Sequence, residues 1–184
     1  ILPNYPMTNW SDEVEPRKKS KIIRMVHVGA LGLDTMHLEL ICQWVMSQAG
    51  KYTLDFITSN IADSAYQYIK SVECDKIRIL STTEYYDIPN LLSAYSIGLV
   101  LYKGVVPNYI FNVPNKVSEY LHCGLDVWYP NSLESTSAWA KKNGLSKSLD
   151  TTLPQEFESI LKDGFDRRKF SAEGALRTLL EKLN

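Results

Sequence analysis

Several features that would place a chain in a special class are scarce in this sequence. Its 184 residues include only 9 Gly, 8 Pro, 3 Cys and 3 His, and 45% of the residues are hydrophobic. Such a composition excludes a collagen-like, low-complexity or disordered protein. An excess of one charge is missing as well, because 20 Lys and Arg face 21 Asp and Glu, for a formal net charge of −1. We therefore expect no nucleic-acid partner, since dedicated nucleic-acid-binding proteins carry a basic surface.

Long apolar runs are also missing. No run approaches the roughly 20 apolar residues that a helix needs to span a bilayer, so we expect no transmembrane segment. Residues 1–6 lack the basic and apolar regions of a secretory signal, and the chain starts at Ile1 rather than Met, which favours a piece of a longer protein. Cys42, Cys74 and Cys123 are odd in number and far apart, which indicates reduced thiols and a cytoplasmic protein.

The sequence contains no cluster of residues with metal-ligand spacing. His27, His37 and His122 are scattered, and no C-x-x-C pair is present, so we predict no metal site. Each histidine is more simply a packing or surface residue. For His27 the alternative is that it lines the loop that follows the first predicted strand.

Hydrophobic patterning predicts strands that alternate with helices after residue 20. The predicted strands are 22–28, 52–57, 77–80, 97–102 and 127–129, with a short sixth candidate at 145–149, and the predicted helices are 35–48, 62–72, 88–95, 114–123, 133–142, 154–161 and 171–183. This alternation indicates an α/β fold, a doubly wound Rossmann-like parallel sheet of about six strands with helices on both faces. Residues 1–20 are predicted to be a linker or irregular arm, and residues 21–184 one domain.

The loop after the first strand is a candidate ligand site, because open parallel sheets bind ligands at the carboxyl ends of their strands. Gly29 and Gly32 let backbone N–H groups approach a ligand closely, and the positive end of the next helix would face the same place. Phosphate would suit such a loop, but an ordinary tight turn explains the glycine spacing equally well. The patterns GxGxxG and GxxxxGK[ST] are absent, which argues against ordinary NAD enzymes and P-loop NTPases.

The second candidate is the start of the helix predicted at 114–123. Lys116 and Glu119 share one face of this helix, three residues apart. A cation in the first turn opposes the helix dipole, and it becomes favourable if an anion binds there. Glu119, one turn deeper, would accept hydrogen bonds from sugar hydroxyls. The alternative is a surface ion pair worth a few tenths of a kcal/mol.

Residues 114–124, PNKVSEYLHCG, resemble the PNK(L/V)xEYLxxG signature of GT-B glycosyltransferases, which lies in their C-terminal, nucleotide-sugar-binding half. The resemblance is closest to the family 4/group 1 enzymes that build bacterial polysaccharides. Three further segments match in the right order: residues 26–31 resemble the family's strand-one loop, residues 91–99 its LLSxADIGL segment, and residues 2–6 the segment between its two halves. Together these segments extend over nearly the whole chain.

This resemblance implies a set of site residues. Glu119 corresponds to the glutamate that binds the ribose of the donor nucleotide, and Lys116 would lie near its pyrophosphate. The loop at 81–85 falls where the family holds the edge of the base. The donor-binding residues implied in this way are Gly29, Ala30, Leu31, Gly32, Thr82, Thr83, Asn115, Lys116 and Glu119. No catalytic residue is assigned.

The function implied is that of a donor-binding half of a hexosyltransferase. The complete enzyme would transfer a sugar from a nucleotide-sugar to an acceptor hydroxyl in bacterial polysaccharide or glycoconjugate synthesis, in the cytoplasm or at the inner face of the membrane. The family needs no cofactor and no essential metal, because cationic side chains and helix termini stabilise the leaving diphosphate. The acceptor, a glycan or lipid-linked glycan, would bind the N-terminal half, which this chain lacks. We expect the isolated chain to fold without activity, with Tyr109, Ile110 and Phe111 facing the missing half.

The sequence also departs from the family. Asn112 stands seven residues before Glu119, where many members have a second glutamate. The Arg and Lys that often follow strand one are missing from residues 32–39, and Asp126 replaces a common proline. Two other functions therefore stay open. One is a nucleotide-sugar 2-epimerase, which needs acid/base carboxylates and histidines, and the other is a non-catalytic module that binds nucleotide or a partner protein.

Overall fold

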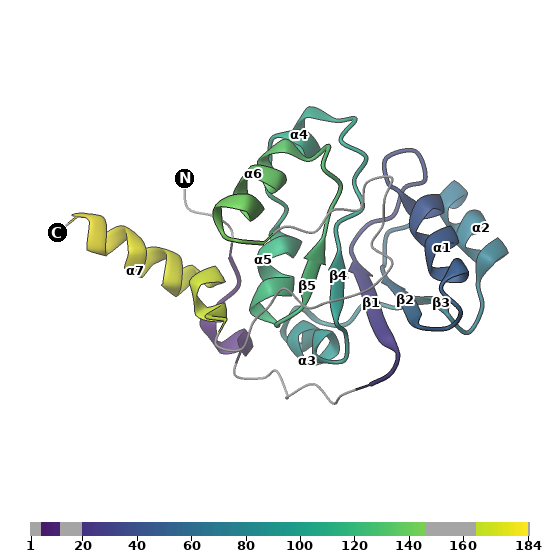
Figure 1. Ribbon diagram of the computed structural model, residues 1–184, viewed down its shortest axis with the longest axis horizontal. Coiled ribbons are helices and arrows are strands. Elements are labelled where there is room, and N and C mark those ends of the chain that lie inside the picture. Colours follow the sequence, from purple (N-terminus) through teal and green to yellow (C-terminus); the bar gives the residue numbers. More distant parts are fainter. Residues whose placement is uncertain (1–4, 12–19, 146–164, 184) are drawn as a thin grey trace.

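The computed structural model describes residues 5–11, 20–145 and 165–183, and in these ranges it contains one five-stranded sheet (Figure 1). The strands are β1 (Ile23–Val28), β2 (Tyr52–Ile57), β3 (Ile77–Leu80), β4 (Ile97–Leu99) and β5 (Asp126–Trp128). Every neighbouring pair is parallel, in the order β3-β2-β1-β4-β5. The predicted Rossmann-like sheet is therefore confirmed, with five strands in the described residues. The strand order reverses between β1 and β4, which is where such sheets bind ligands.

The predicted helices that fall on described residues follow the predicted order with shifted ends, and four short helices that were not predicted lie among them. The helices of the described residues are η1 (Thr8–Ser11), α1 (Leu38–Ser47), α2 (Asp63–Val72), η2 (Tyr85–Asp87), α3 (Ile88–Ser93), α4 (Pro107–Ile110), α5 (Asn115–His122), α6 (Glu134–Lys142), η3 (Arg167–Phe170) and α7 (Ala172–Leu183). The short helix α4 lies in the stretch 103–113, for which the sequence analysis predicts neither a helix nor a strand. The predicted helix at 154–161 lies outside the described residues, as does the sixth strand beyond Leu145.

Helices cover both faces of the sheet. Figure 1 shows α1 and α2 on one side of the strands and α3, α5 and α6 on the other. Successive strand residues alternate between two cores, because side chains along a strand point to opposite faces. Met25 packs into the core under α1 and α2, and Val26 packs into the core under α3, α5 and α6. Both side chains are fully buried.

Helix α5 packs directly on the strands at the switch point. The ring of Tyr120 lies over Gly98 of β4, so closely that a Cβ at residue 98 would lie 2.2 Å from the Tyr120 Cγ. The Tyr120 hydroxyl accepts a hydrogen bond of 2.9 Å from the Val28 N–H at the end of β1. Because both contacts are buried, the orientation of α5 relative to β1 and β4 is well defined.

Residues 5–11, the described part of the irregular arm predicted for residues 1–20, are packed against the domain. Residues 5–11 contain η1, and Trp10 is only 2% exposed within the core. The Ala172 N–H donates to the Pro6 carbonyl at 2.8 Å, and the Thr8 N–H donates to the Glu173 carboxylate at 2.9 Å. These contacts hold residues 5–11 against the start of α7. The proposed linker role of this segment stays a prediction.

One buried charge is part of the fold and lies away from the carboxyl ends of the strands. Asp55 of β2 is 1% exposed. Arg78 of β3 donates to its two carboxylate oxygens, each at 2.8 Å, and the Tyr95 hydroxyl donates at 2.7 Å. Arg24 of β1 lies 3.5 Å away. Burial opposes ionisation of Asp55, but these partners outweigh it and hold the pKa of this carboxyl below its ordinary value.

Candidate functional site

A cavity of about 290 Å³ lies at the carboxyl edge of the sheet, between α4 and the start of α5. Its lining residues are Tyr102, Asn108, Tyr109, Asn112, Pro114, Asn115, Lys116 and Glu119. Three predicted site residues, Asn115, Lys116 and Glu119, therefore share one cavity. The other predicted residues, in the loops at 29–32 and 82–83, do not line it.

Two other cavities lie away from the strand ends. One of about 330 Å³ lies between η1 and α7, and one of about 440 Å³ lies beside η3. The wall of the first is largely charged side chains of residues 166–181, and the wall of the second combines the aromatic rings of Phe165 and Phe170 with polar and charged side chains. Neither contains a residue that the sequence analysis selected. Size alone therefore does not identify the site, and the chemistry of the lining residues decides between the cavities.

Lys116 and Glu119 form an ion pair in the wall of the first cavity, with Nζ and Oε2 2.5 Å apart. The Glu119 side chain is only 9% exposed, and the Lys116 side chain is 26% exposed. Among the described residues, Lys116 is the polar partner of this carboxylate. A carboxylate has about four acceptor positions, so Glu119 keeps capacity to accept hydrogen bonds from a ligand.

The first turn of α5 adds unpaired backbone donors. Pro114 is the N-cap, and the Val117 N–H donates back to its carbonyl at 3.0 Å. The N–H groups of Asn115 and Lys116 have no acceptor within residues 5–11, 20–145 and 165–183. The same turn contains no acidic residue, so nothing in it offsets the helix dipole. This end of α5 can therefore receive an anion or a ligand oxygen.

The loop after β1 is held largely by the protein itself. The Gly29 N–H donates to the Ile57 carbonyl at 3.0 Å, and the Leu31 N–H donates to the Asn60 carbonyl at 2.9 Å. Gly29 has a φ of 140°, a conformation that favours glycine. Two of the four predicted phosphate donors therefore already have partners, which leaves the N–H groups of Ala30 and Gly32.

The prediction that a helix starts at residue 35, close behind this loop, is wrong. Helix α1 begins at Leu38, because residues 33–37 are bound to the segment after β4. The His37 N–H donates to the Leu101 carbonyl, and the Lys103 N–H donates to the Thr35 carbonyl, both at 2.8 Å. The Lys103 ammonium group also donates to the Leu33 carbonyl at 2.9 Å. The start of α1 is therefore separated from the loop at 29–32 by residues 33–37.

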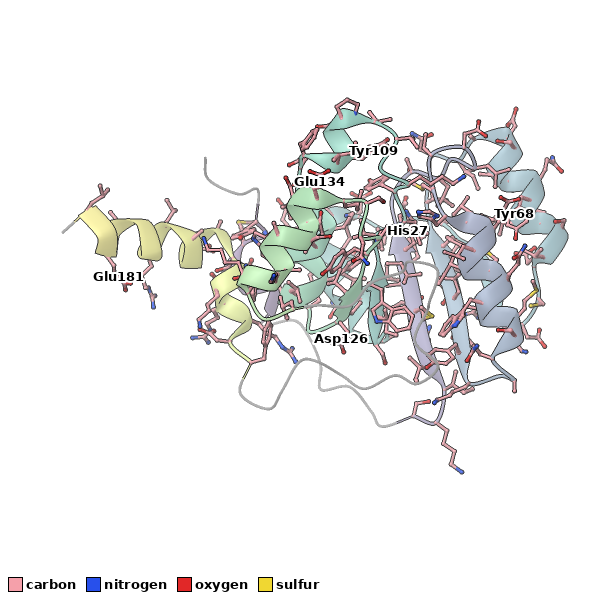
Figure 2. All side chains as sticks on the ribbon, turned by 45° about the horizontal axis from the view of Figure 1, so that its top comes forward. His27, Tyr68, Tyr109, Asp126, Glu134 and Glu181 are labelled. Atoms are coloured by element: carbon pink, nitrogen blue, oxygen red, sulfur yellow. The ribbon has the colours of Figure 1, made fainter. Side chains whose placement is uncertain are left out.

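His27 connects this loop to β4. Figure 2 shows it at the end of β1, on the same edge of the molecule as Tyr109. The ring is 3% exposed, with Nδ1 2.9 Å from the Leu99 carbonyl oxygen and Nε2 3.4 Å from the Ala30 carbonyl oxygen. Burial lowers the pKa of His27, and the charge of Lys116 lowers it further, although the two carbonyls oppose this. The two alternatives for His27 are thus both fulfilled, because it packs in the core and lies beside the loop.

The loop after β3 approaches Glu119 through Tyr85. Burial raises the pKa of Tyr85, and the negative charge of Glu119 adds to this effect. The Tyr85 ring also packs against Trp10, with centroids 4.8 Å apart. Thr82 is exposed and Thr83 half-buried, and both lie in the segment just before η2. The aromatic residue, rather than the two threonines, is thus the part of this loop that the structure links to Glu119.

Tyr102 and Asn108 are cavity residues that sequence reasoning missed. Tyr102 stacks on Tyr109, with ring centroids 4.2 Å apart and an interplanar angle of 15°. Tyr102 ends a strand-like run, and only the fold of residues 103–113 brings α4 back over it. A tyrosine at a strand end, opposite a polar helix start, is the signal that would have indicated this wall.

The loop at 103–113 exposes apolar side chains, in part as expected. Phe111 is 65% exposed, whereas Tyr109 and Ile110 are half-buried. Val105 and Val106, which the sequence analysis did not select, are 62% and 36% exposed. The rim of the cavity is therefore apolar, although the residues that form it are not all those predicted.

The described residues bear on two predicted absences, that of a metal site and that of a transmembrane segment. No group of three or more His, Cys, Asp or Glu in that part of the chain could hold a metal ion. No helix there is both long enough and apolar enough to cross a membrane. The expected independence of metals and cofactors stays a prediction.

Of the comparisons with known proteins, only the one with solved structures gives a match. Neither a protein-family model nor a curated protein matches this sequence. Among solved structures, a mutant of the O-GlcNAc transferase of Thermobaculum terrenum matches with a TM-score of 0.56 over 96% of this chain, at 14% identity. The match establishes the fold alone. It agrees with the Rossmann-like α/β architecture described above, and the chain spans 35% of that protein's length.

Proposed function

We propose that this chain is the donor-binding half of a glycosyltransferase that transfers a sugar from a nucleotide-sugar to an acceptor hydroxyl. The observation that carries the proposal is the position of Glu119. This nearly buried carboxylate has spare acceptor capacity and lies in a cavity at the carboxyl edge of a Rossmann-like sheet, beside a cation and two unpaired N–H groups. Such a site suits a ligand that carries hydroxyls next to negative charge, and the nucleotide of a sugar donor has both.

The proposed roles follow the chemistry of the side chains. Glu119 accepts hydrogen bonds from the ribose hydroxyls, which are donors. Lys116 and the first N–H groups of α5 neutralise the diphosphate. The loop at 29–32 borders the diphosphate on the other side, through Ala30 and Gly32. The loop at 81–85 borders the base, and burial and the charge of Glu119 both raise the pKa of its Tyr85.

A complete transferase would need a second half. The exposed apolar rim of the cavity, formed by Val105, Val106 and Phe111, supports a partner on this side. The likeness to 35% of a longer GT-B enzyme is consistent with this arrangement. We propose that the missing half binds the acceptor and that the reaction takes place between the two halves, in the cytoplasm or at the inner membrane face.

A second candidate, a non-catalytic nucleotide-binding module, is favoured by one observation. Asn112 lines the same cavity as Glu119. At this position many members of the family that the sequence resembles have a second glutamate, so this chain has a neutral amide in place of a carboxylate. Nucleoside diphosphate release by the full-length protein separates these functions. A transferase releases UDP or GDP and labels an acceptor, an epimerase interconverts donors, and a binding module does neither.

Ligand binding by the chain itself is the first test. We would measure the melting temperature with UDP, GDP, uridine, guanosine and inorganic phosphate, because a ligand that binds the folded state raises it. One of the two diphosphates should raise it more than its nucleoside and more than phosphate. If none of the five compounds changes the melting temperature from that of the chain alone, and calorimetry shows no heat of binding, the proposal is contradicted.

A further inference from the structure

Both ring nitrogens of His27 lie near carbonyl oxygens, and a neutral imidazole can donate a hydrogen bond to only one of them. Nδ1 lies 2.9 Å from the Leu99 carbonyl oxygen, and Nε2 lies 3.4 Å from the Ala30 carbonyl oxygen. A carbonyl oxygen only accepts, so each contact is a hydrogen bond only if that ring nitrogen carries a proton. A neutral imidazole has one N–H and an imidazolium has two. The shorter contact fixes the first proton on Nδ1, and the Nε2 lone pair then faces the Ala30 oxygen.

The surroundings of His27 keep the free protein in the neutral state. The ring is 3% exposed, and Phe56 of β2 packs near it with ring centroids 6.5 Å apart. From α5, the charge of Lys116 reaches the ring and lowers the pKa of His27, after the larger effect of burial. Nearby, Tyr120 of α5 binds the Val28 N–H, and Lys103 binds the Leu33 carbonyl. Among the described residues Lys116 is thus the charged group that acts on the ring, and it acts against protonation.

A bound diphosphate would reverse this balance. Under the proposed function its charge neutralises Lys116 and leaves net negative charge beside the loop at 29–32. Nε2 lies at this loop, because a Cβ at residue 29 would be 3.8 Å from it. A nearby negative charge favours the imidazolium. The second ring proton would then convert the contact with the Ala30 carbonyl into a hydrogen bond.

We infer that His27 takes up a proton from solvent when a diphosphate binds beside it, and that the protonated ring then holds the loop at 29–32 through Ala30. His27 is in this sense a positioning residue, which senses the ligand charge and fixes a loop that borders it. The inference rests on the proposed function, since it requires the diphosphate to bind between Lys116 and this loop. It adds a prediction that the ribose and base contacts do not make, namely that binding of the diphosphate depends on pH through a buried side chain.

Calorimetry in buffers of different ionisation enthalpy measures the proton uptake. We would titrate UDP and GDP, with uridine and guanosine as neutral references, into the whole chain between pH 6 and 8. For each proton taken up, the affinity rises up to tenfold per pH unit as the pH falls. The diphosphate that binds should show a proton uptake from His27 in addition to the proton change of its own terminal phosphate, and its nucleoside should show none.

The variant His27→Asn separates proton uptake by His27 from the proton change of the ligand phosphate. Its amide nitrogen can replace Nδ1 as donor to the Leu99 carbonyl, but the amide does not titrate. The terminal phosphate of UDP or GDP itself titrates near pH 6, and it contributes equally to both proteins. We therefore expect the wild-type chain to take up more protons than His27→Asn, and its affinity relative to that variant to rise as the pH falls.

His122→Asn is the matched control. His122 is also buried, and its ring nitrogens lie 3.1 Å from the Arg167 oxygen and 3.3 Å from the Thr8 oxygen. It is the last residue of α5, at the opposite end from Lys116. Its substitution should leave the proton uptake on binding unchanged. An equal loss of uptake in both variants would contradict a specific role for His27.

A measurement on the wild-type chain keeps the inference testable if His27→Asn does not fold. NMR of chains with labelled histidine should show the His27 ring change from a neutral to a protonated signal when UDP or GDP is added at pH 7. Binding without this change, and without an excess of proton uptake over the variant, would overturn the inference and leave the proposed function intact. No binding of either diphosphate at any pH would overturn both.

Discussion

Two Lys–Glu pairs in this chain have the same spacing and the same contact, and they lie in different environments. In both, the lysine precedes the glutamate by three residues, and Nζ lies 2.5 Å from Oε2. Lys70 lies in the last turn of α2, and the Glu73 side chain is 31% exposed. Lys116 lies in the first turn of α5, and the Glu119 side chain is 9% exposed, in the wall of a cavity.

The two pairs have the same sequence spacing, so their difference comes from their position in the helix and from their burial. A lysine at the C-terminal end of a helix is favourable for the helix dipole, so the Lys70–Glu73 pair needs no further partner. Hydrogen bonding within that pair raises the pKa of Lys70 and lowers that of Glu73. Lys116 lies at the unfavourable end, and its partner is withdrawn from water. The same sequence pattern is therefore a surface pair in α2 and a candidate ligand site in α5.

The largest effect is expected for Asp55, a buried carboxylate to which we assign a structural role only. Asp55 is more buried than Glu119, but Arg78 and Tyr95 already donate three hydrogen bonds to it. Asp55→Asn should lower the free energy of unfolding by about 2–3 kcal/mol, because charge-assisted hydrogen bonds are lost. Nucleotide affinity should stay the same. Urea unfolding and calorimetry measure both quantities, and a selective loss of affinity would contradict the structural role.

The same residue predicts a dependence of stability on pH. The pKa of Asp55 is lower in the folded chain than in the unfolded chain, so its ionised form stabilises the fold at neutral pH. This contribution is present above the ordinary pKa of about 4 and is lost as the pH falls through the lower pKa of the folded chain. The difference in stability between wild type and Asp55→Asn should therefore shrink below about pH 4. A difference that stays constant to pH 2 would contradict it.

The second prediction compares the two glutamates. Glu119→Ala should weaken binding of UDP or GDP by roughly ten- to a hundred-fold, because a charge-assisted hydrogen bond is worth about 1.5–3 kcal/mol. The nucleoside should lose about as much affinity as the diphosphate, since the ribose is common to both. Glu73→Ala is the matched control and should leave both affinities unchanged. Equal behaviour of the two variants would show that α5 carries an ordinary surface pair.

The third prediction compares the two lysines. Lys116→Ala should weaken binding of the diphosphate by about tenfold or more and change nucleoside binding little, because its partner is the diphosphate charge. Lys70→Ala should change neither. Calorimetric titrations of all four compounds give the comparison directly. A loss of nucleoside affinity as large as that of the diphosphate would place Lys116 near the ribose or base instead.

The sequence predicted the regular parts of the fold well, because these depend on local patterns. Strands β2 and β3 have the predicted bounds, since short apolar runs flanked by turn residues define them. The packing of η1 and Trp10 was not predicted, because Trp10 contacts residues such as Tyr85 that are distant in sequence. The late start of α1 has the same cause, a backbone contact between two loops.

The candidate site was predictable only in part. The spacing of Lys116 and Glu119, and the motif around them, pointed to the helix start that lines the cavity. The wall formed by Tyr102 and Tyr109 was not predictable, because their stacking depends on the path of the loop between them. The loop at 29–32 was predicted as a phosphate loop from its glycines, but hydrogen bonds to Ile57 and Asn60 already use two of its donors.

A crystal structure of the chain with the nucleoside diphosphate that binds it tests the central claim most directly. We expect the ligand in the cavity between α4 and α5, with the ribose hydroxyls on Glu119 and the diphosphate near Lys116 and the first turn of α5. The Lys70–Glu73 pair should be the same with and without ligand. A nucleotide bound in the cavity between η1 and α7, with Glu119 still paired only to Lys116, would contradict the account.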